Sequence, residues 1–552
     1  MIRDFFRLLK SLMPRERYVF FSALTLFVFA LGLSILNNFY NNTVVQPASG
    51  GEYTEGIVGQ PIAINPILMG SNEPDQVLVK TLFSSLMTLA DSYNTSSKGT
   101  VWSIKLKPDL KWSDGQPLTS DDVLFTVQTI QDPAAGSPQL AAWQGVTIER
   151  ISEREVRFTL KAPYAFFVDN LKTLYVAPAH LFEQVPPANL HLATYNLEPI
   201  GSGPFKFVSY EKQKNGFISS YHLTANSEYP GKRALIDKLN FIFFSNYNDA
   251  FLSFNTKSID GLGGFDPINV TDLKINHQTD AFALPRYYAV FFNPTVPSAT
   301  NDSTVRTALD LATNKQRLIT DVLSGHGQIA LGPLSPFTPG YNADIYVHDH
   351  NSTDEAISLL SKNGWKKDAG GILTRTVGKT TQRLEINLFT PDIPFLVTTA
   401  NHLKEDWAAI GAKVTVTSVA LDQLRDSNIK GRTYQALLFG NVLRDNGDIY
   451  SFWHSSARFS PGLNLAVYKN SAVDGLLESI RKNFDEAKRN VDLKKLQQII
   501  HDEHPAIFLY SPEYLYAAPR DLGGLDQKFL LSPSDRFADS NLWFLNTSRV
   551  FK

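Results

Sequence analysis

Cysteine is absent from all 552 residues of the sequence. This absence excludes a disulfide framework, a thiolate metal site and a cysteine nucleophile. It also excludes attachment to a membrane through a lipid-modified cysteine. The absence does not identify the compartment, because many exported proteins fold without disulfides.

Strong net charge and the common catalytic motifs are also missing. The formal charge is −2, which argues against nucleic acid as the main partner. The sequence contains no G-x-S-x-G, H-E-x-x-H, P-loop or G-x-G-x-x-G motif. The segment 348–350 (HDH) is the most metal-like cluster, but it has no third ligand nearby, so a solvated loop is the better interpretation. We therefore predict no catalytic residue, no metal and no cofactor, and a protein that is not an enzyme.

Long apolar runs are rare, and the one that occurs lies near the N-terminus. Residues 18–36 carry no charge and could span a hydrocarbon core of about 30 Å. Basic residues dominate the segment before this run, and the segment after it is uncharged until Glu52. The positive-inside rule then places the start of the chain in the cytoplasm and the rest outside. We predict a single-pass signal anchor in the cell membrane, with the C-terminal part extracellular or periplasmic.

A cleaved signal peptide is the competing interpretation of the same run. No small-x-small cleavage site follows Leu36, which favours the anchor. The segment after the run is rich in Asn, Gly, Ser and Pro and is predicted to be flexible. The expected N-terminal parts are a basic cytoplasmic arm (1–17), a transmembrane helix (18–39) and a tether (40–52).

The rest of the chain alternates strand-like and helix-like segments, which predicts an α/β protein of two to four domains. Val101–Leu106 alternates as a strand, Asp114-Gly115 favours a turn, and Thr119 is placed to cap a helix. Two further helices are expected over 471–483 and 485–503.

A second α/β unit lies later in the chain. Residues 383–389 (RLEINLF) and Lys413–Val419 alternate as strands, and residues 395–410 between them are helix-like. Gly411 stands where a helix commonly ends. A strand, a helix and a strand of these lengths predict a parallel crossover.

Residues 101–130 (VWSIKLKPDLKWSDGQPLTSDDVLFTVQTI) carry the most specific pattern. They closely resemble the signature of family 5 extracellular solute-binding proteins, which runs L-x-x-x-x-x-W-S-D-G-x-P-L-T-x-x-D-V. Segments 201–207 (GSGPFKF), 287–294 (YYAVFFNP) and 506–510 (AIFLY) resemble further family segments. Residues 436–454 lie where the family carries W-x-x-D-Y-x-D-P, but here Phe439 and Asp448-Ile449 depart from that pattern.

The resemblance implies a two-lobed periplasmic-binding-protein-like fold of type II, with an extra subdomain, behind the N-terminal helix. The expected divisions are a first lobe with an inserted subdomain (53–285), a second lobe (286–517) and a C-terminal return to the first lobe (518–552). The implied function is capture of peptides between the lobes and delivery to the permease of an ABC importer.

The resemblance also implies the candidate ligand-binding residues. In the family's peptide binders an acid three positions before the Asp of Asp-Pro pairs the peptide ammonium, and that position is Asp445 here. The other candidates are Arg444, Tyr450, Trp453, His454 and Tyr287. For Asp445 the alternative is an exposed turn, and for the aromatic residues it is core packing. If residues 450–453 form a strand, Tyr450 and Phe452 share one face and Trp453 lies on the other.

Three other functions remain open. The same fold could bind a nickel chelate, an oligosaccharide or an amino-acid conjugate, because the departures from the family pattern weaken the peptide assignment. A surface receptor that transports nothing is the second, although the cytoplasmic arm is too short for an output domain. A hydrolase is the third, but no nucleophile or metal site is identifiable.

Overall fold

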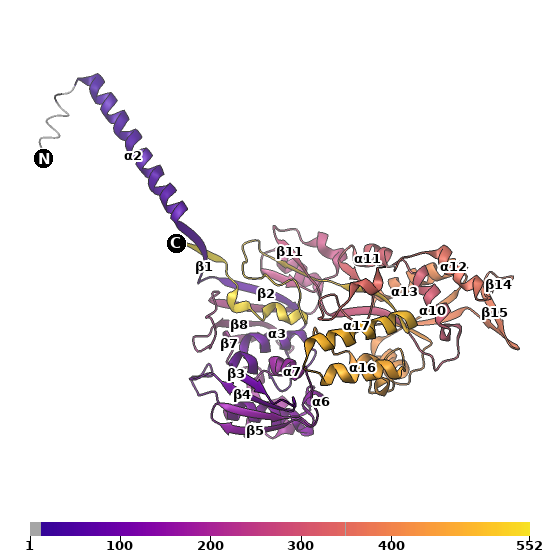
Figure 1. Ribbon diagram of the computed structural model, residues 1–552. Coiled ribbons are helices and arrows are strands. Elements are labelled where there is room, and N and C mark those ends of the chain that lie inside the picture. Colours follow the sequence, from indigo (N-terminus) through magenta and orange to yellow (C-terminus); the bar gives the residue numbers. More distant parts are fainter. Residues whose placement is uncertain (1–10, 12, 348, 552) are drawn as a thin grey trace.

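The computed structural model describes residues 11, 13–347 and 349–551 and shows an α/β body from which one long helix projects (Figure 1). That helix, α2 (Pro14–Asn42), has no buried residue. Its length is about 43 Å at 1.5 Å per residue. It is long and apolar enough to span a membrane, as an anchor or as a signal sequence. Most of the predicted cytoplasmic arm lies outside the described residues.

The predicted flexible tether is wrong over most of its length. Strand β1 (Thr43–Ala48) begins where α2 ends and pairs antiparallel with β22 (Asn546–Phe551), near the other end of the chain. Figure 1 shows the C-terminus at the base of α2, beside β1. A local reading of composition could not find this strand, because its only partner lies at the opposite end of the sequence.

A seven-stranded sheet forms the part of the body nearest to the two-stranded ribbon of β1 and β22 (Figure 1). Its order is β11-β21-β10-β2-β9-β8-β7, and β2 pairs in parallel with both β10 and β9. The strands are β2 (Glu52–Val58), β7 (Phe205–Lys212), β8 (Ile218–Ala225), β9 (Lys238–Phe244), β10 (Gly261–Gly263), β11 (Gln278–Phe282) and β21 (Tyr514–Ala518). Because β21 pairs within this sheet, the expected boundary at residue 517 falls inside one of its strands.

A four-stranded sheet in the order β3-β4-β6-β5 shares one hydrophobic core with the seven-stranded sheet. The strands are β3 (Ala90–Thr95), β4 (Val101–Leu106), β5 (Thr147–Ser152) and β6 (Glu155–Thr159). The predicted strand at β4 is confirmed. The predicted cap is confirmed too: Thr119 caps α5 (Ser120–Gln131) and forms a capping box with Asp122.

A six-stranded sheet in the order β13-β20-β12-β19-β17-β18 forms the other half of the body. The strands are β12 (Arg286–Phe292), β13 (Gly327–Ile329), β17 (Glu385–Pro391), β18 (Lys413–Val419), β19 (Ala436–Val442) and β20 (Ala506–Pro512). Strands β17 and β18 are parallel, with α13 (Pro394–Ala409) between them, so the predicted crossover is confirmed. A small sheet of β14 (Lys366–Lys367), β15 (Leu373–Val377) and β16 (Thr380–Arg383) lies beyond it.

Helices cover both faces of the six-stranded sheet. Along β12, Val290 and Phe292 enter one hydrophobic cluster, and Ala289 and Phe291 enter another on the opposite face. The two helices predicted late in the chain are α16 (Ser471–Lys482) and α17 (Glu486–Glu503), and they pack on the second of these clusters. The other longer helices are α3 (Glu73–Leu82), α7 (Phe167–Thr173), α9 (Tyr247–Asn255), α10 (Ser303–Ala312), α11 (Lys315–Leu323) and α12 (Thr353–Lys362).

Candidate functional site

The main cavity lies where three separate parts of the chain meet, and it has a volume of about 540 Å³. Helices α3 and α7 supply one side of it. The segment 443–445, directly after β19, supplies a second side, and the C-terminal segment 531–539 supplies a third. Chain segments that are far apart in sequence therefore build this site, and two of the predicted residues, Arg444 and Asp445, line it.

The segment after β19 is held against α7 by side-chain hydrogen bonds. Arg444 Nη1 donates to Asn170 Oδ1 at 2.8 Å, and Asn446 Nδ2 donates to Asp169 Oδ2 at 2.8 Å. These contacts place the intervening residue, Asp445, at the cavity wall. They join a helix that packs in the core of the four-stranded sheet to a loop of the six-stranded sheet.

Asp445 is the charged group at this wall that lacks a side-chain partner among the described residues. It is half-buried, and no side chain among the described residues forms an ion pair or hydrogen bond with its carboxylate. Burial raises the pKa of Asp445, the nearby Asp169 carboxylate raises it further, and Lys172 lowers it. A cation entering the cavity would relieve both effects, because it would neutralise a carboxylate that the protein leaves uncompensated.

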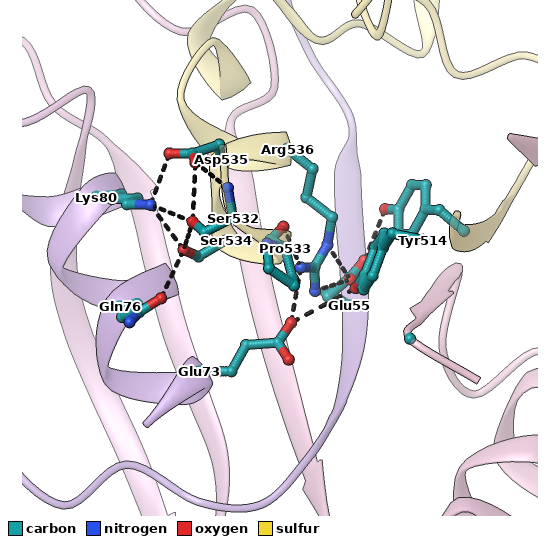
Figure 2. A network of polar contacts seen from close by, with 12 residues as sticks. Glu55, Glu73, Gln76, Lys80, Tyr514, Ser532, Pro533, Ser534, Asp535 and Arg536 are labelled. Atoms are coloured by element: carbon teal, nitrogen blue, oxygen red, sulfur yellow. Dashed lines mark hydrogen bonds and ion pairs between the residues drawn. The ribbon is translucent and has the colours of Figure 1, made fainter. Parts of the chain in front are cut away.

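Lys80 faces the same cavity from α3 but is fully engaged. Its Nζ donates to Asp535 Oδ1 at 2.6 Å, to Ser534 Oγ at 2.7 Å and to Ser532 Oγ at 2.9 Å, as Figure 2 shows. Gln76, one helical turn earlier, accepts from Ser534 Oγ at 3.0 Å. The C-terminal segment is thereby fixed to α3, and this pair of charges forms part of the cavity wall.

A second, more deeply buried cluster lies next to the Lys80 cluster (Figure 2). Arg536 is 1% exposed; its Nη2 lies 2.9 Å from Glu55 Oε1, and its Nη1 lies 2.9 Å from Glu73 Oε1. Burial alone would lower the pKa of Arg536, but Tyr514 and the two carboxylates reverse the effect and raise it. The guanidinium therefore stays charged, and the cluster joins β2, α3 and the C-terminal segment.

Sequence reasoning missed Lys80, Asp169, Lys172 and Asp535 as wall residues. Gln76 and Lys80 stand one turn apart on α3, so they share one face of the helix, which is a weak signal of a polar site. No pattern in the sequence indicates the pairing of Lys80 with Asp535, because only the fold brings these two residues together.

The aromatic candidates lie elsewhere. Residues Tyr450–Trp453 form a helical turn, α15, so the period-two reading of this run is wrong. Trp453 is 1% exposed and packs in the core against Tyr468 and Phe508. The ring of Tyr450 stacks on His454 at 4.1 Å.

The two remaining candidates are buried as well. His454 lies 3.8 Å from Asp474 and has little exposed surface. Tyr287 is 2% exposed, and its hydroxyl accepts from Asn441 Nδ2 at 2.9 Å. None of these four side chains lines the main cavity as the structure describes it.

Asp448, the reference point for locating Asp445, is itself a link between the two halves of the body. It accepts from Arg481 Nε at 2.8 Å and from Tyr164 O–H at 2.8 Å. In the HDH segment, His348 lies outside the described residues, and Asp349 accepts from His501 at 2.9 Å. No group of three or more metal-ligating side chains occurs in the part of the chain that the structure describes.

Comparison with known proteins shows which family and which solved structures this chain resembles. Residues 87–460 match the family described as "Bacterial extracellular solute-binding proteins, family 5 Middle". The oligopeptide-binding protein AppA of Bacillus subtilis is 27% identical over 501 residues, which cover 87% of this chain and 89% of that protein.

Solved structures share the fold. The structure of AppA from Bacillus subtilis in complex with a nonapeptide has a TM-score of 0.69 and 26% identity, and the match covers 91% of this chain and 100% of that one. The ABC transporter substrate-binding protein CtaP of Listeria monocytogenes has a TM-score of 0.76 at 23% identity, covering 90% and 99% of the two chains. The chain therefore belongs to family 5 of the bacterial extracellular solute-binding proteins.

Proposed function

We propose that this protein captures peptides in the main cavity and delivers them to the permease of an ABC importer. The observation that carries the proposal is the uncompensated carboxylate of Asp445 at the wall of that cavity. A free peptide presents an α-ammonium, which such a carboxylate would bind by a charge-assisted hydrogen bond. The cavity volume of about 540 Å³ lies within the range of small-ligand sites.

The relatives support a peptide as the ligand. The relative from Bacillus subtilis is named an oligopeptide-binding protein, and its solved structure holds a nonapeptide. Peptides of varied sequence share only their backbone and termini. A site that recognises those common groups, with room for side chains and water, therefore suits a receptor for many peptides.

The proposed mechanism is closure of two lobes around the ligand. We assign the seven-stranded and four-stranded sheets to the first lobe and the six-stranded sheet to the second, with the crossing near residues 283–286 and 512–514. The contacts of Tyr164 with Asp448 and of Arg444 with Asn170 would then bridge the lobes. A ligand favours closure only through contacts that differ between open and closed forms.

The proposed location is the outer face of a cell membrane, with α2 retained as the anchor. Anchoring keeps the receptor close to its permease and so raises the effective concentration of one for the other. The proposal includes no chemical change of the ligand: the protein would act as a receptor and not as an enzyme.

The test is mass spectrometry of small molecules released by denaturation from the full-length protein purified in detergent. We expect a mixture of short peptides from the unaltered protein and at least tenfold less from the Asp445→Asn variant. The lost charge-assisted hydrogen bond is worth about 1.5–3 kcal/mol, which corresponds to roughly ten- to hundredfold in affinity. The matched control is Asp422→Asn, whose side chain is 84% exposed and outside the cavity.

Two outcomes would contradict the proposal. A single non-peptide compound in the unaltered protein would overturn the ligand class, and equal peptide recovery from Asp445→Asn would overturn the anchor. The affinity for a defined peptide should also fall as the pH is lowered from neutral, because the raised pKa of Asp445 makes it protonate sooner than an ordinary aspartate. The Asp445→Asn variant should lack this dependence.

A further inference from the structure

Arg286, the first residue of β12, is a mostly buried charge without a partner. Its Nε is fully buried and unpaired, and no described side chain forms an ion pair with its guanidinium. Other enclosed arginines have partners: Arg536 has two carboxylates, and Arg432 donates to the carbonyls of Arg458 and Gly462. Arg375 also has an unpaired Nε, but its Nη1 pairs with Asp302 at 2.7 Å. A buried charge without compensation is costly, so its presence calls for an explanation.

The side chain borders a second cavity of about 390 Å³. Among the described residues, this cavity shares no lining side chain with the main one. Its walls are aromatic on both sides. Phe265 and Tyr514 come from the part built on the seven-stranded sheet, and Tyr288 and Phe395 come from the part built on the six-stranded sheet.

The two acidic side chains at this cavity, Glu513 and Asp266, contact groups other than Arg286. Glu513 Oε2 lies 3.7 Å from His326 Nδ1, and Asp266 accepts from the backbone N–H of Ile268. Neither is within ion-pairing distance of Arg286 in the described contacts. Burial lowers the pKa of Arg286, and only the hydroxyls of Tyr288 and Tyr514 act in the opposite direction.

We propose that this cavity is a second ligand site, in which Arg286 binds the carboxylate of a small organic acid while the aromatic walls hold its apolar body. A guanidinium presents paired N–H groups that match the two oxygens of a carboxylate. Aromatic side chains provide a large contact area for a flat or apolar group. A phosphate dianion fits less well, because the walls hold two acids and no second base.

The position of the cavity couples ligand binding there to the arrangement of the two sheets. Both sheets contribute to its walls where the chain crosses between them, at β11–β12 and β20–β21. An acid bound there would contact both parts at once. It would therefore favour the relative arrangement of the two parts that fits it best.

The experiment uses the full-length protein in detergent, with isothermal calorimetry and three probes: 3-phenylpropionate, its neutral amide, and phenyl phosphate. We expect the carboxylate to bind at least tenfold more tightly than the amide and more tightly than the phosphate. Arg286→Gln should reduce carboxylate binding at least tenfold. Arg286→Lys should retain weaker binding, because a lysine keeps the charge but lacks the paired N–H groups.

Two controls make the result specific. Thermal unfolding checks that the variants are folded, and Arg286→Lys tests the proposal if the glutamine variant is unstable. Asp422→Asn should bind the carboxylate probe normally, because its side chain is exposed and lines neither cavity. Equal binding of acid and amide, unchanged binding in Arg286→Gln, or tighter binding of phenyl phosphate would overturn the proposal. Such a failure would leave peptide capture at Asp445 unaffected, since the recovery of co-purified peptides measures that function separately.

Discussion

At the scale of single residues, the cluster around Arg536 shows how the C-terminal segment is held in the body. Glu55 is 0% exposed and accepts from both Arg536 and Tyr516. Burial raises the pKa of Glu55, and Arg536 lowers it. The two charges depend on one another, because either alone would be buried without compensation.

Replacing Arg536 with leucine should therefore destabilise this region by about 3–5 kcal/mol. The loss should be greater at pH 8 than at pH 5. Without Arg536 the pKa of Glu55 in the folded state rises further above its unfolded value, so the folded state holds the extra proton and stability falls as the pH rises. Hydrogen exchange of the amides in β2 measures the effect.

The matched control is Arg150→Leu, which removes a half-exposed ion pair with Asp121. Its cost should be below about 1 kcal/mol. Similar losses in the two variants would show that the buried cluster contributes no more than a surface pair.

The contrast between Arg536 and Arg286 belongs to the same scale. Both are arginines enclosed by tyrosines, and Tyr514 lies near each of them. Only Arg536 has carboxylates within ion-pairing distance in the described structure. This difference separates a side chain that stabilises the fold from one that is available to a ligand.

At the scale of elements, helix α5 is determined by residues that are adjacent in the sequence. Thr119 Oγ1 accepts from the N–H of Asp121, and Asp122 Oδ2 accepts from the N–H of Thr119 at 2.8 Å. Val123, Val127 and Ile130 then face the core. The turn, the cap and the apolar spacing all lie within one short stretch.

Thr119→Ala should reduce the stability of α5 by about 1 kcal/mol, because the helix loses the side-chain acceptor at its N-terminus. The amides of the first turn of α5 should exchange faster with solvent than in the unaltered protein. Thr119→Ser retains a hydroxyl and should behave nearly as the parent does. Equal exchange in the alanine variant and the parent would refute the role of the cap.

The sequence allowed good prediction of elements whose signals are local. Strands β4 and β18, the crossover through α13, and helices α16 and α17 all follow from alternation, capping or helical spacing. Strand β1 did not, because its composition resembles a linker and its partner is β22. The turn α15 did not either, since its aromatic residues fit a strand as well as a helix.

The candidate site could be predicted only where the family pattern reached it. Arg444 and Asp445 line the main cavity, and their loop is recognisable by its position relative to Asp448. Lys80 and Asp535 meet through folding alone, so no spacing along the chain could relate them. Arg286 is notable for the contacts it lacks, which a sequence cannot display.

At the scale of the whole molecule, the ribbon of β1 and β22 decides how the body is held at the end of α2. Six residues of each strand pair, from Thr43 with Phe551 to Ala48 with Asn546. Phe551 packs against Phe39 at 5.8 Å, and the guanidinium of Arg549 lies 4.3 Å from the ring centre of Tyr40. A paired ribbon of this size is about 20 Å long and stiffer than a single strand of linker.

Deleting residues 546–552 should make this connection flexible. The amides of β1 should lose their protection from exchange, and a protease should cleave the segment 43–51 at least tenfold faster. The body should keep its thermal unfolding temperature, because β1 and β22 pair only with each other among the described strands. The control is Ser548→Ala, which leaves the backbone pairing intact. Protection of β1 that survives the deletion would contradict this role for β22.

The ribbon also makes the connection between α2 and the body depend on the order of synthesis. Translation produces α2 and β1 well before β22, because most of the sequence separates the two paired strands. The paired connection at the end of α2 is therefore completed only after the body between the two strands has been made. A product that ends before β22 would carry an unpaired β1 open to proteolysis, whereas pairing with β22 protects this segment.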